Sequence, residues 1–289
     1  MKRLMHKFRS NYMVNVFFSL TGNPKACIWT EPLWGIPYNL YLPYVTLFMT
    51  SIGMSYAEIG YVTSITMASQ MICAVLSGVL TDKLGRRRCT VIFDILSWSV
   101  PELLWMCSQS FAWFAVAAAF NGMWRITENS WYLLMIEDAD KERAVALNSL
   151  TQLMGLMAAF FAPLSKFAVD AFGIVPTMRA FYGLACVSMT AKFLILYRAS
   201  TETQNGIRRM EATKDKSIFQ LLWECKDVYL RIIREKRMLL TLAILSAYML
   251  VTTLNSNYWA IYLRDMLGIQ EGNVALFVTL RSLVTLGCS

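Results

Sequence analysis

Long apolar segments dominate the chain, and short polar connections separate them. Each is close to the roughly 20 residues that a helix needs to cross a bilayer. The segments span residues 27–50, 58–80, 90–107, 111–135, 146–169, 178–196 and 238–263, and a further one begins at 273. Because only helices and closed barrels satisfy the backbone in lipid, this pattern predicts an all-α, polytopic membrane bundle with about seven to eight transmembrane helices.

The first segment contains three prolines, Pro32, Pro37 and Pro43. Each proline removes one backbone donor and crowds the preceding turn. We therefore expect this helix to be bent or locally unwound, which neighbouring helices in a bundle tolerate.

Composition supports the membrane assignment and excludes a soluble domain. The chain is 56% hydrophobic, against roughly 45–50% in soluble proteins. Its net charge of +8 arises from cations near the start of the chain, in the turn at 83–88 and in the stretch 198–237. Cytoplasmic loops of membrane proteins are rich in lysine and arginine, so these regions and the N-terminus are predicted to be cytoplasmic and to contact lipid headgroups, with no nucleic-acid partner.

The remaining composition argues against a metal site or an enzyme. Seven cysteines are scattered singly, and His6 is the only histidine. Neither a zinc site nor a disulfide framework follows from this spacing, and no cofactor is expected. The apolar segments hold no histidine and no acidic cluster, so an integral membrane enzyme is disfavoured.

Polar residues inside apolar segments are the candidate functional residues, because charge in a bilayer is costly. The sharpest group is in segment 111–135: Asn121, Arg125, Glu128 and Asn129, spaced i, i+4, i+7 and i+8 on one helical face. This face either lines a cavity that binds solute or a proton, or pins the helix to its neighbours through an Arg125–Glu128 pair.

Three further candidates lie in the first and third segments. Glu31 either carries a proton or extends to the interface, and Asn39 lies near the middle of the same segment. Glu102 follows Pro101, where a helix break would leave a hydrated pocket. We assign all three to the predicted solute or proton pathway.

The turn between the second and third segments carries a specific motif. The pattern G-x-x-x-D-[RK]-x-G-R-[RK] is fulfilled at every required position, by Gly78, Asp82, Lys83, Gly85, Arg86 and Arg87. On this motif the chain resembles a prokaryotic transporter of the major facilitator superfamily. Asp138 and Arg143 form a second, shorter match in the connection after the fourth segment.

The resemblance implies a fold and an activity. Members of the family have twelve helices in two six-helix halves, which rock around a central site to move a small solute, often coupled to a proton or another ion. It also implies that the loop with Asp82 and Arg86 braces the cytoplasmic face and controls the switch between states. The expected location is the cell membrane.

The domain organisation follows from the same comparison. We expect a six-helix bundle at 1–196, a cytoplasmic basic loop with an amphipathic helix at 197–237, and the start of a second bundle at 238–289. Since the expected helices nine to twelve are absent from this sequence, a truncated or partial copy is predicted. The alternative is a membrane remnant that associates with partners and does not transport.

Two positions depart from the family pattern. Arg125 follows Gly122, whereas the family arginine precedes the glycine of that helix. The antiporter motif of the fifth helix is also absent: Gly155 and Pro163 are present without a glycine pair. The first departure argues against giving Arg125 the family's proton-coupling role, and the second disfavours a drug/proton antiporter.

Overall fold

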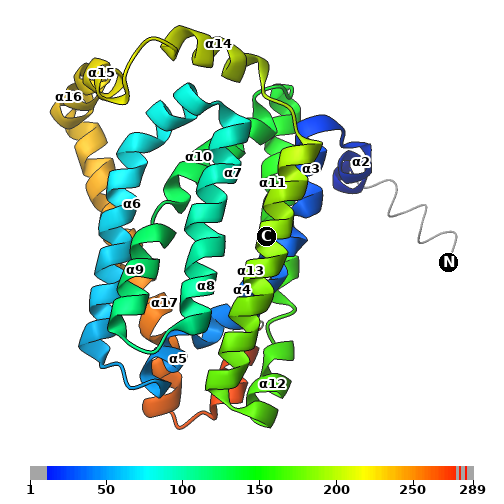
Figure 1. Cartoon of the computed structure of the whole chain (residues 1–289), viewed down its shortest axis with the longest axis vertical. Coiled ribbons are helices and arrows are strands. Elements are labelled where there is room, and N and C mark those ends of the chain that lie inside the picture. Colours follow the sequence, from blue (N-terminus) through cyan, green and yellow to red (C-terminus); the bar gives the residue numbers. More distant parts are fainter. Residues whose placement is uncertain (1–11, 278–279, 281–283, 285–289) are drawn as a thin grey trace, which may run out of the picture.

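The computed structural model describes residues 12–277, 280 and 284 as a helical bundle (Figure 1). The cations at positions 2, 3, 7 and 9 and Arg281 lie outside the described residues. Within the described part, five helical stretches are long and apolar enough to cross a membrane: Tyr56–Leu84 (α6), Arg86–Cys107, Arg143–Phe172, Ile174–Ala199 (α13) and Lys236–Asp265 (α17). These findings agree with the predicted all-α membrane bundle.

The first apolar segment is broken, as its prolines predicted. After the short helix α2 (Tyr12–Ser19), it consists of α3 (Gly22–Thr30), α4 (Pro32–Tyr41), a 3-10 turn at Leu42–Tyr44 and α5 (Val45–Ser51). Pro32 begins α4 and Pro43 lies in the 3-10 turn. Both prolines thus fall where a missing backbone donor costs least.

The fourth segment is also broken, although the sequence predicted one continuous helix. It is divided into α9 (Phe111–Asn121) and α10 (Trp124–Ile136). The break lies at Gly122, where a Cβ atom would be 2.4 Å from Cβ of Ser69 in α6. Close contact between two helices at this point therefore requires glycine, and Ser69 Oγ donates a hydrogen bond to the Ala119 carbonyl there.

The third and fifth segments each contain one irregularity. The third consists of α7 (Arg86–Asp94), a π-helical turn (Ile95–Ser99) and α8 (Val100–Cys107), with Pro101 in the first turn of α8. The fifth consists of α11 (Lys141–Ala159) and α12 (Leu164–Phe172), divided just before Pro163. Prolines and π-turns are ordinary causes of such interruptions.

Three short helices follow α13 at the end of the bundle that carries the motif loop (top of Figure 1). They are α14 (Gln204–Thr213), α15 (Ile218–Glu224) and α16 (Lys226–Arg234). The sequence predicted one amphipathic helix for this stretch. Its apolar residues at 218–233 fall in α15, which begins with a capping box of Ser217 and Gln220, and in α16, and Cys225 separates these two helices.

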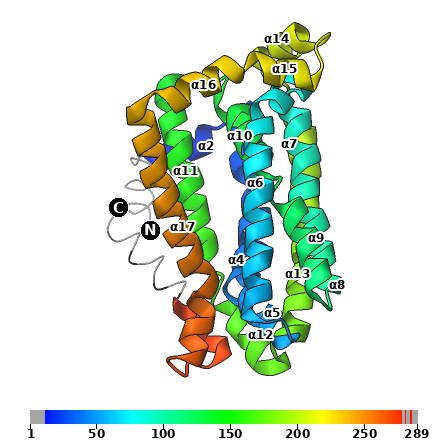
Figure 2. The ribbon, with the colours of Figure 1, turned by 90° about the vertical axis from the view of Figure 1, so that its left-hand side faces the viewer.

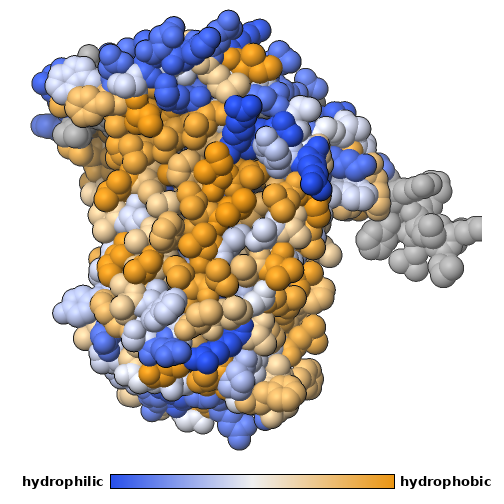
Figure 3. Space-filling view, in the orientation of Figure 1, coloured by the Kyte–Doolittle hydropathy of each residue, from blue (hydrophilic) through white to orange (hydrophobic). Residues whose placement is uncertain are grey.

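The surface has an apolar belt between two polar ends (Figure 3). Large apolar side chains of several helices are exposed on the outside of the bundle, among them Tyr61, Phe167, Val187, Leu240 and Val251. A soluble protein rarely exposes so large an apolar surface. The belt is what contact with lipid requires.

Helix α17 runs along the bundle beside α6 (Figure 2). It is held to the first six segments by polar contacts: Asn257 Nδ2 donates to Thr63 Oγ1 (2.9 Å) and Arg264 Nη1 to Thr50 Oγ1 (3.2 Å). The chain then turns through a 3-10 helix (Glu271–Asn273), where Gly272 accepts a hydrogen bond from Tyr44. A cavity lies between α17 and the first segments.

Candidate functional site

A cavity of about 440 Å³ is enclosed by the broken first segment, α6, the third and fourth segments and α17. This volume is in the range of pockets that hold small organic molecules. Its aromatic lining residues are Trp34, Tyr38, Tyr41, Trp98, Trp105 and Trp124, and its polar ones are Thr46, Thr63, Thr66, Gln70, Asn121, Thr253 and Asn257. The lining thus joins residues that are far apart in the sequence.

Several aromatic residues of the cavity form a contiguous cluster. The rings of Trp34 and Tyr38 are stacked, with centroids 4.6 Å apart. Trp98 meets both edge-on, at 5.0 and 5.7 Å. The proline-rich break in the first segment positions this cluster, since Trp34 and Tyr38 lie one turn apart in the short helix α4.

The predicted group in the fourth segment is divided by the helix break. Asn121 lines the cavity, and its Nδ2 donates to the Ser97 carbonyl at 3.0 Å. Arg125 and Glu128 form an ion pair at 2.6 Å, as their spacing allowed, but the two side chains are 33% and 52% exposed. Asn129 instead donates to Thr81 Oγ1 at 3.4 Å. Only Asn121 of the four residues lines the cavity.

Arg125 also contacts one aromatic residue of the cavity wall. Its guanidinium carbon lies 4.2 Å from the ring centroid of Trp124, which is the distance of a cation–π contact. Arg125 is therefore already engaged by Glu128 and Trp124 in this conformation.

Glu31 is buried in an ion pair that the sequence did not predict. Its Oε2 accepts a hydrogen bond from Lys192 Nζ of α13 at 2.8 Å, with both side chains largely buried. Asp94 of α7 lies near enough to interact with the same ammonium group. Lys192 is a lone lysine within a long apolar segment, and that isolation was the signal that could have identified it.

The other two pathway candidates are buried. Asn39 donates its Nδ2 to the Gly35 carbonyl at 2.7 Å, one turn back in the same helix. Glu102 is 0% exposed, and among the described residues neither of its carboxylate oxygens has a hydrogen-bond partner. Glu102 lies next to Tyr41, whose ring lines the cavity.

The motif loop is built around Arg86, which is almost fully buried. Its Nε and Nη2 donate to the two carboxylate oxygens of Glu137, both at 2.9 Å, and its Nη1 donates to Asp82 Oδ1 at 3.1 Å. Asp82 also pairs with Arg209 of α14 at 2.8 Å. The bidentate contact between Arg86 and Glu137 is a strong form of ion pairing. The sequence motif indicated Asp82 and Arg86, but it did not indicate Glu137, which pairs with Arg86.

The rest of the loop contacts the segment that follows α13. Glu202 accepts hydrogen bonds from the backbone N–H groups of Arg86 (2.8 Å) and Arg87 (3.0 Å), at the start of α7. Arg87 donates to the Tyr197 carbonyl at 2.9 Å. Lys83 donates to carbonyl groups at the end of α14, including that of Thr213 at 3.3 Å.

Two glycines of the motif differ in surroundings. Gly85 has φ +81°, and a Cβ atom there would lie 2.5 Å from Oε2 of Glu202. Gly78 lies within α6 and has open space around its Cα. Gly85 is therefore required both by backbone conformation and by the approach of the segment after α13.

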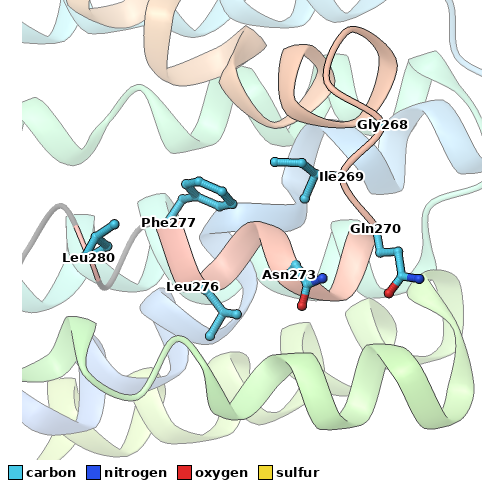
Figure 4. A pocket seen from close by; sticks show the side chains of 7 residues that line it. All are labelled: Gly268, Ile269, Gln270, Asn273, Leu276, Phe277 and Leu280. Carbon is cyan, nitrogen blue, oxygen red and sulfur yellow. The ribbon is translucent and has the colours of Figure 1, made fainter.

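Another hollow lies at the opposite end of the bundle, where the chain turns after α17 (Figure 4). It is lined by Gly268, Ile269, Gln270, Asn273, Leu276, Phe277 and Leu280. Its side chains are apolar or amide-bearing, and none of the candidate residues lies in it. We do not assign a functional site there.

Comparison with known proteins gives one family. Residues 34–288 match the model of the Major Facilitator Superfamily. A search of curated proteins gave no match. The matched range contains the whole cavity and the motif loop, whereas Glu31 precedes it.

Proposed function

The chain belongs to the major facilitator superfamily, whose members are integral membrane transporters, and we propose that it moves a small solute by alternating access around the aromatic cavity. The observation that carries this proposal is the composition of the cavity wall. Thr253 and Asn257 of α17 face the cavity from one side, and residues of the first four segments face it from the other. A rocking motion between these two groups would open and close the cavity.

The polar candidate residues take the following roles in this proposal. Asn121 contacts the solute, because it lines the cavity. Helix α10, beyond the break at Gly122, carries Arg125, Glu128 and Asn129, which respond to movement at that break. The buried polar pathway consists of Glu31, Asn39 and Glu102. Coupling to a proton or another ion through one of the acidic residues is part of the proposal.

The motif loop is proposed as the conformational switch. Gly78, Asp82, Lys83, Gly85, Arg86 and Arg87 hold α6, α7 and the segment after α13 together. Because Asp82 binds Arg86 and Arg209 at once, displacement of α14 would remove one partner of Asp82. In the proposed domain organisation of 1–196, 197–237 and 238–289, this loop belongs to the first unit, and its contacts with Glu202 and Arg209 support its role at the connecting segment.

We test the function by flux measurements in proteoliposomes that contain the full chain, with a panel of radiolabelled small solutes. Thr253→Trp fills the cavity, and Thr252→Trp makes the same change one residue away, at a position that does not line it. We expect saturable flux of at least one solute, its loss in Thr253→Trp and its retention in Thr252→Trp. Absence of saturable flux for the whole panel, or equal flux in both variants, would overturn the proposal.

For location, we propose the plasma membrane, with the N-terminus and motif loop in the cytoplasm. The gathering of Lys83, Arg86, Arg87 and Arg88 at one end supports this orientation. Two free cysteines at opposite ends permit a test: Cys107 ends α8, and Cys225 lies between α15 and α16. A membrane-impermeant maleimide applied to intact cells should label Cys107 and not Cys225, and labelling of Cys225 without permeabilisation would contradict the orientation.

A further inference from the structure

The aromatic cavity offers ring faces and neutral polar groups to a bound molecule. Stacked Trp34 and Tyr38 and the edge-on ring of Trp98 form its aromatic side. The faces of such rings carry negative electrostatic potential, which attracts cations. Among the described residues, the cavity lining includes no charged side chain.

The two nearest cations are already neutralised. Arg125 pairs with Glu128 at 2.6 Å and covers Trp124. Lys192 lies 5.8 Å from the ring centroid of Trp34, yet its ammonium group is held by Glu31 at 2.8 Å. An anionic solute in the cavity would therefore find no free cation among the described residues.

A carboxyl group without a partner lies behind the aromatic wall. Glu102 is fully buried, and neither of its oxygens has a hydrogen-bond partner in the described part of the chain. The hydroxyl groups of Tyr41 and Tyr182 and Nε1 of Trp105 are unpartnered in the same way. Tyr41 and Trp105 both line the cavity, and Tyr41 lies beside Glu102.

A negative charge on a carboxyl group buried beside only a tyrosine hydroxyl is costly. The cost is recovered when an opposite charge approaches through a low-dielectric region, where attraction is much stronger than in water. A cation in the cavity meets this condition, because it would lie against the ring faces on one side and near Glu102 on the other.

We infer that the cavity binds an organic cation with an apolar or aromatic body, and that Glu102 selects its charge. This inference rests on the proposed function, since it names the solute class for the same cavity. The rings of Trp34, Tyr38 and Trp98 contact the body and the positive charge, and Glu102 acts across Tyr41. The sequence left the charge of the solute open, because Arg125 suits an anion and Glu128 suits a cation. In the structure neither residue lines the cavity, so neither decides the charge of the solute.

The test is equilibrium binding to the purified full chain in detergent, which does not depend on transport. The probes are tetraphenylphosphonium and tetraphenylborate, which share a shape and carry opposite charges. Glu102→Gln removes the charge and keeps the side-chain size. Asp94→Asn is the matched control, because Asp94 is also a buried carboxylate of the third segment but interacts with Lys192, whereas Glu102 lies beside Tyr41.

We expect tetraphenylphosphonium to bind saturably and more tightly than tetraphenylborate. Glu102→Gln should lower the affinity for the phosphonium about tenfold, whereas Asp94→Asn should leave it unchanged. Trp98→Leu should weaken phosphonium binding as well. Equal or tighter binding of the borate, binding that Glu102→Gln leaves unchanged, or no binding of either probe would each overturn the inference. If the inference about an organic cation fails in this way, saturable flux of another solute that is lost in Thr253→Trp would still support the transport proposal. The inference and the transport proposal can therefore fail separately.

Discussion

Nζ of Lys192 lies 2.8 Å from Oε2 of Glu31, inside the bundle, and joins α13 to the junction of α3 and α4. Removing one partner of a buried ion pair leaves an uncompensated charge. We therefore expect Lys192→Met to destabilise the protein by about 3 to 5 kcal/mol, measured as a loss of thermal stability in detergent.

A double variant separates this effect from packing. Lys192→Met combined with Glu31→Gln removes both charges of the pair, so most of the lost stability should return. If the double variant is no more stable than Lys192→Met alone, the ion pair is not the cause of the destabilisation.

The contacts of Glu137 predict a pH dependence at the motif loop. Burial raises the pKa of Glu137, but hydrogen bonds from Arg86, Thr203 and Asn205 outweigh burial and hold this pKa below its ordinary value of 4.5. A carboxyl whose pKa is lowered on folding contributes stability that is complete above its unfolded pKa and is lost as pH falls through the folded value. The attachment of α14 should therefore weaken in acid, below pH 4.5.

Hydrogen exchange of the α14 amides, corrected for the intrinsic rate, measures this attachment. Glu137→Gln should reduce protection about tenfold at pH 7, because a hydrogen bond to a charged group contributes about 1.5 to 3 kcal/mol. The variant should also lose the acid response of the unmodified protein. An acid response of equal size in Glu137→Gln would assign it to another group.

Gly122 and Gly155 offer a matched pair of substitutions. A Cβ atom at Gly122 would meet Ser69 of α6 at 2.4 Å, whereas one at Gly155 of α11 meets nothing within 4 Å. Gly122→Ala should destabilise by about 1 to 3 kcal/mol through overpacking. Gly155→Ala should be neutral or stabilising by up to about 1 kcal/mol, as in other helix interiors. Thermal unfolding of both variants checks this, and equal effects would contradict the close α6–α9 contact.

Gly85 and Gly173 form a second pair, with φ of +81° and +78°. With ψ of 159° and 168°, both glycines lie in a backbone region that other residues hardly adopt, so an alanine costs on the order of 1 to 3 kcal/mol at either site. Only at Gly85 would the new methyl group also displace a neighbour, the Glu202 carboxylate that caps α7. Gly85→Ala should therefore be the more destabilising and should alone increase hydrogen exchange in α14. The same exchange in both variants would mean that Glu202 does not hold this segment.

The sequence by itself determined the membrane fold and the family. Apolar segments of spanning length can satisfy their backbone only as helices, so the bundle follows from hydropathy alone. The motif at Gly78–Arg87 is a local pattern, and the prolines of the first segment act on their own helix. These features were predicted because each depends on residues close together in the chain.

Tertiary structure alone decided which polar residues share a site. Hydropathy does not show which face of an apolar helix points inward, so Lys192 was missed and the partners of Glu31 and Arg86 were unknown. The break at Gly122 lies against Ser69 of another helix, and it divides Asn121 from Arg125 and Glu128 although their spacing placed them on one face. The aromatic cavity likewise exists only where α4, α6, α9 and α17 meet, because contacts between residues distant in sequence create it.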